Sequence, residues 1–235
     1  MRKITSTVLG IITLLMGSVG QTQAEQRALT VVELFTSQGC SSCPPADHVL
    51  GELALEENII ALSYHVDYWD YMGWTDLFGR PENSERQRVY AQRLKQKNVY
   101  TPQMIINGTE DVVGSRPVDV ARAIMQAKTR TMPVTVEIWP VAEGLLVSAD
   151  SNGLPEGTYE LLAVTITPTA EAYIKRGENR GKTIRYVNVV RDVKTIGHLS
   201  NGQARLNVPV IQGAKQVIFV QAQGQGPIVG AALQD

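Results

Sequence analysis

The sequence predicts an α/β (α+β) domain followed by a small all-β, sandwich-like domain. Three observations support this prediction. Residues 29–36 and 58–66 are apolar and rich in β-branched and aromatic residues, as buried strands are. Between them, apolar residues recur at helical spacing. After residue 132 the helical pattern gives way to short β-prone segments, which is typical of a small β-sandwich or barrel.

Local signals place the elements of the first domain. Pro44 and Pro45 suit the first turn of a helix, because their missing N–H groups would find no partner there. Ser84 and Gln87 have the spacing of a capping box, and Asn107-Gly108 is a strong hairpin signal. The predicted elements are strands at 29–36 and 58–66, helices at 44–57 and 85–97, strands at 102–106 and 110–114, and a helix at 115–127.

Met132-Pro133 marks the predicted boundary between the two domains. The first domain then covers residues 25–132 and the second covers residues 133–235. Glycine, proline and asparagine separate the β-prone segments of the second domain, and no amphipathic helix pattern occurs there. The predicted strands are at 134–139, 144–149, 158–167, 183–191, 203–208, 216–222 and 227–233.

Residues 1–24 have the pattern of a signal peptide. Arg2 and Lys3 precede an apolar run from Val8 to Met16, and small or polar residues follow up to Ala24. The apolar run is too short to span a bilayer, so we expect no stable membrane insertion. The sequence therefore predicts a periplasmic or secreted protein.

The charge balance excludes one class of partner. The chain has 22 basic and 23 acidic residues, and removal of residues 1–24 takes away two basic ones. The net charge then changes from −1 to −3, because 20 basic residues face 23 acidic ones. A mildly acidic protein offers no electrostatic footprint for nucleic acid. No cofactor is expected either.

The two cysteines of the chain, Cys40 and Cys43, form a C-x-x-C motif where a predicted strand meets a predicted helix. The positive end of a helix dipole stabilises a thiolate, which is the form that attacks disulfides. We expect Cys40 to be the exposed, attacking thiol and Cys43 to be buried. A static disulfide or half of a metal site are the alternatives, although a four-thiolate zinc site is excluded because no second C-x-x-C exists.

Residues 29–130 contain the segment VVELFTSQGCSSCPPAD and, at residues 100–108, the segment YTPQMIING. Through these segments the chain resembles the thioredoxin-like superfamily. The resemblance implies that Pro102 has a cis peptide bond and faces the C-x-x-C motif. Thr101 would then present its backbone to an extended peptide substrate. An ordinary trans proline at the start of a strand is the alternative.

Four segments of the chain carry a closer resemblance, namely ELFTSQGCSSCPPAD, HVDYWDYMGW, TPQMIING and GENRGKTIRYVNVVR. Through them the sequence resembles a bacterial family known as domain of unknown function 1223, which consists of secreted thioredoxin-like proteins. This resemblance covers nearly the whole predicted mature chain. It implies a fold and a compartment but no reaction.

One acid of the first strand is a candidate for proton handling. Thioredoxin-like oxidoreductases often hold a buried acid behind the second cysteine, but Leu34 occupies that position when the sequence is aligned on Cys40 without a gap. Glu33 would point to the opposite face, because side chains alternate along a strand. The alternative is that Glu33 is a partly exposed acid at an edge or domain interface.

An aromatic and acidic loop follows the second strand. Six of the fourteen aromatic residues fall within residues 64–78. Trp69 and Trp74, with Thr101, are candidates for a substrate groove, although large aromatics more often pack at an interface. His65 and Asp67 are candidate proton carriers or a metal-coordinating pair. His65 could also stabilise the Cys40 thiolate.

A charged segment in the second domain, residues 176–182, reads as a solvated turn between strands.

These observations leave three functions open. The first is a thiol–disulfide oxidoreductase that uses Cys40 and Cys43 on protein thiols or disulfides, with Pro102 and His65 in the catalytic site. The second is Cu(I) binding by Cys40, Cys43 and His65, because soft thiolates and imidazole suit that ion. The third is a non-enzymatic binding module in which the disulfide merely locks a loop.

Overall fold

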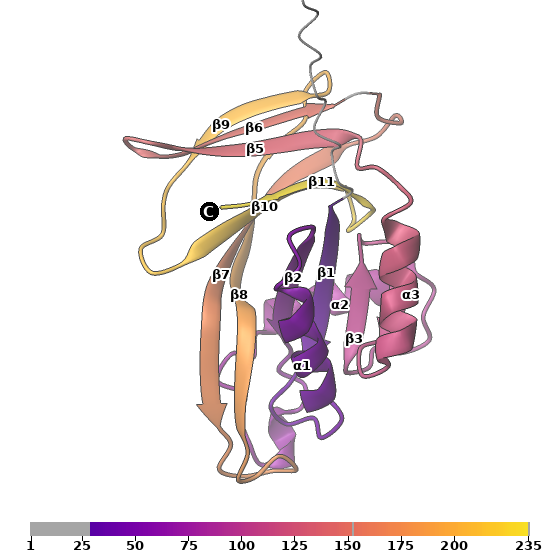
Figure 1. The fold of residues 1–235 in the computed structure, drawn as a ribbon, viewed down its shortest axis with the longest axis vertical. Coiled ribbons are helices and arrows are strands. Elements are labelled where there is room, and N and C mark those ends of the chain that lie inside the picture. Colours follow the sequence, from indigo (N-terminus) through magenta and orange to yellow (C-terminus); the bar gives the residue numbers. More distant parts are fainter. Residues whose placement is uncertain (1–28, 152, 235) are drawn as a thin grey trace, which may run out of the picture.

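The computed structural model describes residues 29–151 and 153–234, so the predicted signal peptide at 1–24 lies outside the described residues. The elements of the first half follow the predicted order (Figure 1). They are β1 (Thr30–Thr36), α1 (Pro44–Leu53), β2 (Ile59–His65), a short 3-10 helix (Asp70–Met72), α2 (Pro81–Arg93), β3 (Gln103–Ile106), β4 (Glu110–Val113) and α3 (Pro117–Ala127).

The second half consists of strands. Each of the seven predicted strands is present, which confirms the all-β character of this segment. Two of them are much longer than predicted, at 15 and 16 residues, and form a long hairpin. The strands are β5 (Val134–Val141), β6 (Gly144–Ser151), β7 (Tyr159–Tyr173), β8 (Thr183–His198), β9 (Gln203–Val208), β10 (Lys215–Ala222) and β11 (Ile228–Leu233).

One mixed sheet of eight strands, in the order β11-β10-β7-β8-β2-β1-β3-β4, runs through both halves of the chain. Strands β1 and β2 are parallel, and β3 and β4 are antiparallel to their neighbours. Helices α1 and α3 pack on one face of β1, β2 and β3, whereas Tyr90 of α2 packs on the other face. Because β1 and β2 are parallel, their C-terminal ends lie at the same end of the sheet, and the cysteine loop follows β1 there.

The C-terminal strands pack face to face as in the predicted sandwich, because β5 and β6 share a buried cluster with β7 and β10, but they are not separate from the first sheet. Only β5, β6 and β9 form a small antiparallel sheet, and the other four C-terminal strands extend the first sheet through β8. Strand β8 lies parallel to β2 at Ser63 and Val189, and the Asn188 side chain donates to the Ala61 carbonyl. The physical reason is that β2 would otherwise be an edge strand with unpaired backbone groups, which a neighbouring strand satisfies.

The predicted limits of two helices also need correction. Helix α1 ends at Leu53 rather than at residue 57. Helix α2 begins at Pro81 rather than at residue 85, because proline is accommodated without loss at the first helical position. Ser84 therefore lies inside α2 and bonds Asp67 instead of forming a capping box.

Glu33 lies in a buried ion pair that joins the two halves of the chain. Its carboxylate is fully buried and accepts a hydrogen bond from Arg86 Nε over 2.8 Å. Arg86 also donates to Gln221 of β10 and to the Tyr90 hydroxyl. Glu33 is thus neither partly exposed nor on the α1 face of the sheet, where Leu34 packs. The structure gives it a role in holding β1, α2 and β10 together.

Candidate redox site

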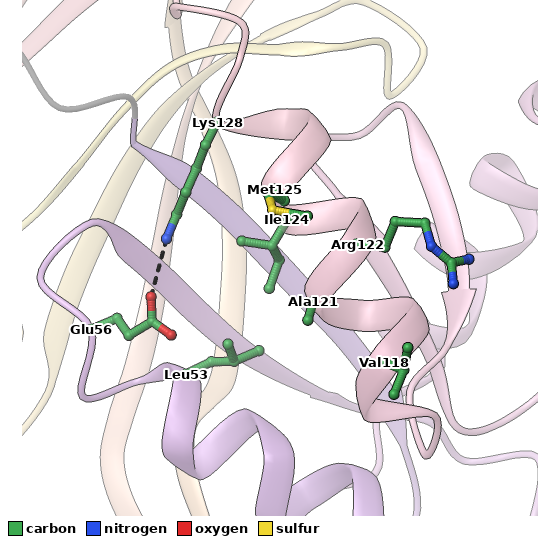
Figure 2. A pocket seen from close by; sticks show the side chains of 8 residues that line it. All are labelled: Leu53, Glu56, Val118, Ala121, Arg122, Ile124, Met125 and Lys128. Carbon is green, nitrogen blue, oxygen red and sulfur yellow. Dashed lines mark hydrogen bonds and ion pairs between the residues drawn. The ribbon is translucent and has the colours of Figure 1, made fainter.

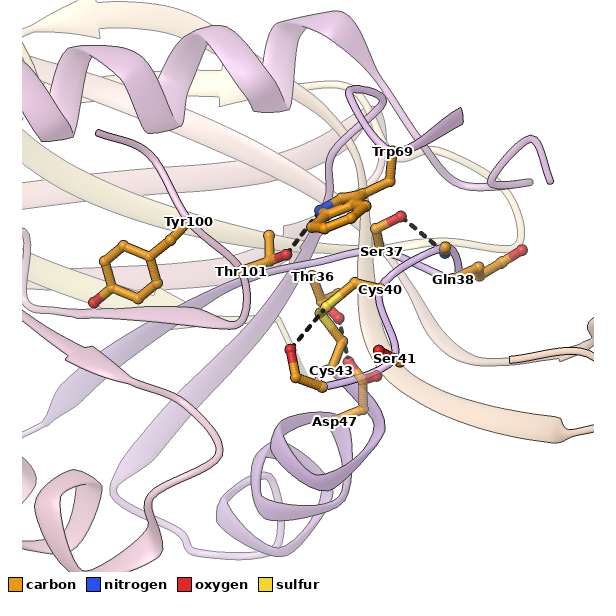
Figure 3. The surroundings of a disulfide bond; sticks show 12 residues. Thr36, Ser37, Gln38, Cys40, Ser41, Cys43, Asp47, Trp69, Tyr100 and Thr101 are labelled. Carbon is orange, nitrogen blue, oxygen red and sulfur yellow. Dashed lines mark hydrogen bonds between the residues drawn. A yellow bond between two sulfur atoms is a disulfide. The ribbon is translucent and has the colours of Figure 1, made fainter. Parts of the chain in front are cut away.

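Cys40 and Cys43 form a disulfide immediately before helix α1 (Figure 3). The Cys43 N–H donates to the Cys40 carbonyl, and α1 begins at the next residue, Pro44. Both cysteines are buried, with 1% of Cys40 and none of Cys43 exposed. The expectation of an exposed Cys40 was therefore wrong for this disulfide state. The sequence could not show it, because the groups that cover Cys40 come from distant parts of the chain.

Trp69 and Thr101 lie on one side of the disulfide. The Trp69 indole N–H donates to Thr101 Oγ1 over 2.8 Å, which joins the loop after β2 to the loop before β3 (Figure 3). Gly39 allows Trp69 to approach, because a Cβ atom added there would lie only 3.1 Å from Trp69 Cβ. The structure thus places two of the three predicted groove residues together beside the cysteines.

The predicted cis peptide bond is present between Thr101 and Pro102, so this prediction is confirmed. Pro102 is buried, and its carbonyl accepts the Gly114 N–H over 2.9 Å at the end of the β3–β4 hairpin.

Trp74, the third groove residue, packs elsewhere. It lies against the cluster formed by the β7–β8 hairpin, which includes Ile174 and Tyr186. Its indole N–H donates to Gln38 Oε1 over 2.8 Å. This contact agrees with the alternative reading of Trp74 as an interface residue and places it outside the Trp69–Thr101 pair.

The charged segment at 176–182 is an exposed turn between β7 and β8, as predicted, except that Asn179 is buried against the cysteine loop. Asn179 is fully buried, and its side-chain amide donates to the carbonyls of Gln38 and Cys40 over 3.0 and 2.8 Å. The Ser41 N–H donates to the Glu178 carboxylate. Asn179 is the one amide side chain among the charged residues of this segment. Its bond to the Cys40 carbonyl spans 139 residues, so local sequence patterns could not predict it.

Asn179 is therefore expected to restrict access to the disulfide. Its replacement by alanine removes one donor from each of the carbonyls of Gln38 and Cys40, at a cost of about 1–3 kcal/mol. Every 1.4 kcal/mol corresponds to a factor of ten, so Asn179→Ala should be reduced by dithiothreitol about tenfold faster than the native protein. Stopped-flow measurement of disulfide loss checks this, with Asn207→Ala on the exposed edge of β9 as the control. Equal rates in all three proteins would contradict it.

His65 is buried at the end of β2 and pairs with Asp76 rather than with Asp67. Its Nδ1 lies 2.8 Å from Asp76 Oδ2, and its ring packs against the rings of Phe78 and Tyr186. The same Asp76 oxygen accepts the Gln38 N–H over 2.7 Å, so the His65–Asp76 pair is joined to the cysteine loop. Asp67 was thus wrong as the partner of His65, since it bonds Ser84 on α2 instead.

The side chains around Asp76 set its charge. Burial would raise the pKa of Asp76, but His65 and the N–H groups of Gln38 and Phe78 together hold it below its ordinary value. Asp76 therefore stays ionised, and this negative charge holds His65 in place.

The alternative Cu(I) site is not assembled in this state. Among residues 29–151 and 153–234, no group of three or more histidine, cysteine, aspartate or glutamate side chains is arranged to hold a metal ion. Cys40 and Cys43 are bonded to each other, and His65 directs Nδ1 to Asp76.

Asp47 is a buried acid that the sequence reasoning missed. It lies in the first turn of α1, four residues after Cys43, and its Oδ1 accepts a hydrogen bond from the Thr36 hydroxyl over 2.8 Å. Burial raises the pKa of Asp47 to about 7, although His65 and the Thr36 hydroxyl oppose the increase. The spacing of four residues was the available signal, because residues i and i+4 share a helix face.

Asp47 should make folding stability depend on pH. Its pKa is higher in the folded chain than its ordinary value of 3.8, so its stabilising contribution is complete below about pH 4 and is lost as the pH rises through about 7. The change amounts to about 4 kcal/mol. We expect Asp47→Asn to lose this part of the pH dependence in urea unfolding between pH 4 and 8. Parallel stability curves for the two proteins would refute the assignment.

A groove at the opposite end of α1 is separate from this site. It has a volume of about 540 Å³ and lies between the end of α1 and helix α3 (Figure 2). Val118 and Met125 are exposed there, and Lys128 forms an ion pair with Glu56 over 3.1 Å. Neither the cysteines nor the residues that cover them line it.

The fold and site define a mixed α/β protein with a covered C-x-x-C disulfide at the start of a helix. The chain belongs to the family described as Protein of unknown function (DUF1223), which matches residues 31–221. It is also similar to the crystal structure of a protein from Agrobacterium tumefaciens, with 30% identity and a TM-score of 0.77 over 88% of this chain and 95% of the other. No curated protein matches the sequence. No helix of residues 29–151 and 153–234 is long and apolar enough to cross a membrane.

Proposed function

We propose that this protein is a thioredoxin-like thiol–disulfide oxidoreductase that acts on protein thiols or disulfides in the periplasm or outside the cell. The observation that carries the proposal is the Cys40–Cys43 disulfide at the start of α1, beside Trp69 and Thr101. Support for the fold comes from the strand order β2-β1-β3-β4 with helices on both faces. Support for export comes from the signal-peptide pattern of residues 1–24.

The two sulfurs have different surroundings, which suits two different roles. Cys40 lies on the loop, and Ser42 Oγ is 3.4 Å from its sulfur, where the hydroxyl can donate to a Cys40 thiolate. Cys43 is covered by the first turn of α1. These surroundings favour Cys40 as the attacked sulfur and Cys43 as the resolving one.

The reaction follows from thiol–disulfide exchange. A substrate thiolate attacks Cys40 Sγ, the Cys40–Cys43 bond breaks, and its electron pair leaves on Cys43 Sγ. The second thiolate of the substrate then attacks the substrate sulfur of this mixed disulfide and releases Cys40 as a thiolate. The substrate dithiol loses two electrons and the cysteine pair gains them, and the same steps in reverse reduce a substrate disulfide.

Insulin reduction tests the proposal. Catalytic amounts of the protein should shorten the delay before insulin precipitates in dithiothreitol, and should speed the recovery of activity by scrambled ribonuclease. The control is the same protein, reduced and then alkylated at both cysteines, which should have no effect. Behaviour of the native protein identical to that of the alkylated control in both assays would refute the proposal.

The burial of the disulfide favours a second candidate, a non-enzymatic binding module. Asn179 donates hydrogen bonds to the carbonyls of Gln38 and Cys40, on either side of Gly39, and only 1% of Cys40 is exposed. Both features suit a disulfide that stabilises a loop. In that case the native protein has no activity in the insulin or ribonuclease assay, and loss of the disulfide only lowers the unfolding temperature.

A further inference from the structure

Three buried polar atoms without hydrogen-bond partners gather beneath the cysteine pair. They are Asp47 Oδ2, His65 Nε2 and the Tyr186 hydroxyl. The rings of His65 and Tyr186 are 4.6 Å apart between centroids, and Asp47 interacts electrostatically with both residues. Buried polar groups are nearly always bonded, so a group of three unpartnered atoms indicates a site where protons or water are exchanged.

The sheet and helix α1 bring these residues together. Thr36 and His65 are paired on the neighbouring parallel strands β1 and β2, and so point to the same face. Helix α1 packs on this face and supplies Asp47. Near the cysteines, strand β1 places Leu34 and Thr36 on this face, so β1 supplies no acid there.

Asp47 lies one helical turn from Cys43. Its N–H donates to the Cys43 carbonyl over 3.0 Å, and side chains four residues apart are neighbours on a helix. In Figure 3, Asp47 lies on one side of the disulfide, whereas Trp69 and Thr101 lie on the other. An acid that serves Cys43 can therefore act without displacing a substrate bound to the Trp69 side.

Asp47 also lines a surface depression on the side away from Trp69. This depression of about 460 Å³ lies between the start of α1 and β8. We call it the α1–β8 depression, and its lining residues are Pro44, Asp47, His48, Lys182, Thr183, Ile184 and Arg185.

We propose that Asp47 gives the Cys43 thiolate its proton when the disulfide is reduced, and recovers that proton from solvent through the α1–β8 depression. This inference rests on the proposed function and names the proton-handling residue of the same site. Asp47 is the proton-transfer group one helical turn from Cys43, and His65 and Asp76 act on its charge in opposite directions.

The step balances with a dithiol as the reductant. When a substrate thiolate bonds to Cys40 Sγ, the electron pair of the broken S–S bond leaves on Cys43 Sγ. The Asp47 carboxylic acid transfers its proton to that sulfur, directly or through one water molecule, and becomes a carboxylate. A proton from solvent then restores the acid, and in the reverse direction the carboxylate takes the proton from Cys43.

The charged groups around Asp47 suit this exchange. His65 from β2 and the Thr36 hydroxyl from β1 favour its carboxylate, while burial and Asp76 favour its acid form. Tyr186 faces it from β8, and Lys182, Arg185 and His48 line the depression that leads to it. The result is a pKa of about 7, close to the pH at which an efficient proton donor works.

Reduction by dithiothreitol at different pH values tests the inference. General acid catalysis contributes about 10²–10⁴-fold, so Asp47→Asn should be reduced at least about 30-fold more slowly than the native protein at pH 5.5. The rate ratio should fall towards one above pH 8, where the native Asp47 has already lost its proton. Asp119→Asn, the same change in the first turn of α3, should keep the native profile.

Thr36→Val gives a second test that preserves the shape of the core. It removes the hydrogen bond that lowers the pKa of Asp47, so the midpoint of the pH profile should rise. A rate ratio for Asp47→Asn that does not change with pH, or an unmoved midpoint in Thr36→Val, would overturn the inference. Because the reductant is a small dithiol, this result is independent of the insulin and ribonuclease assays, which decide the proposed function.

Discussion

Cys43→Ser is expected to stop turnover and to accumulate a mixed disulfide between Cys40 and the substrate. In the proposed reaction a substrate sulfur bonds to Cys40, and Cys43 is the thiol that resolves this bond. Serine has no thiolate, so the intermediate persists. Non-reducing electrophoresis and mass spectrometry of the variant mixed with a disulfide-containing substrate should show the adduct, while insulin reduction falls to the rate without protein.

Cys40→Ser is the matched variant for this prediction. It also loses the disulfide and its small contribution to stability, but it should form little adduct, because Cys43 is covered by α1 and by the cysteine loop. An adduct on Cys43 in Cys40→Ser, with none on Cys40 in Cys43→Ser, would show that the two roles are reversed.

Arg86→Met is expected to cause a large loss of stability while leaving the cysteines intact. Glu33 has no exposed surface, and without Arg86 its charge stays buried and unpaired. Loss of one partner of a buried ion pair costs about 3–5 kcal/mol. The free energy of unfolding, measured with guanidinium chloride by circular dichroism, should fall by this amount.

The double variant Glu33→Gln with Arg86→Met separates the charge from the packing. It removes both charges and keeps side chains of similar volume, so it should recover much of the lost stability. Arg88→Met, a change at an exposed ion pair on the same helix, should alter stability by less than about 1 kcal/mol. A loss of similar size in Arg86→Met and Arg88→Met would contradict the role given to the buried pair.

The sequence by itself determined the local structure and the chemistry of the cysteine pair. Short runs of apolar, β-prone residues predicted each strand of the sheet, and the Asn107-Gly108 turn predicted the β3–β4 hairpin. The C-x-x-C spacing predicted a sulfur pair at the start of a helix. These features depend on residues within about a dozen positions of each other, so periodicity and turn chemistry are enough to find them.

Only the tertiary structure decided what surrounds the cysteines. Asn179 covers Cys40 from 139 residues away, and Asp76 rather than Asp67 pairs with His65 because of the path of an irregular loop. Glu33 points to the face opposite Leu34, as the alternation along the strand predicted, but its partner Arg86, which also bonds Gln221, could not be predicted. Local patterns carry no information about which side chain meets which across the fold, because such contacts form only when distant segments pack together, as when the β7–β8 hairpin docks beside β2. That docking makes one sheet of two predicted domains, and it buries the disulfide.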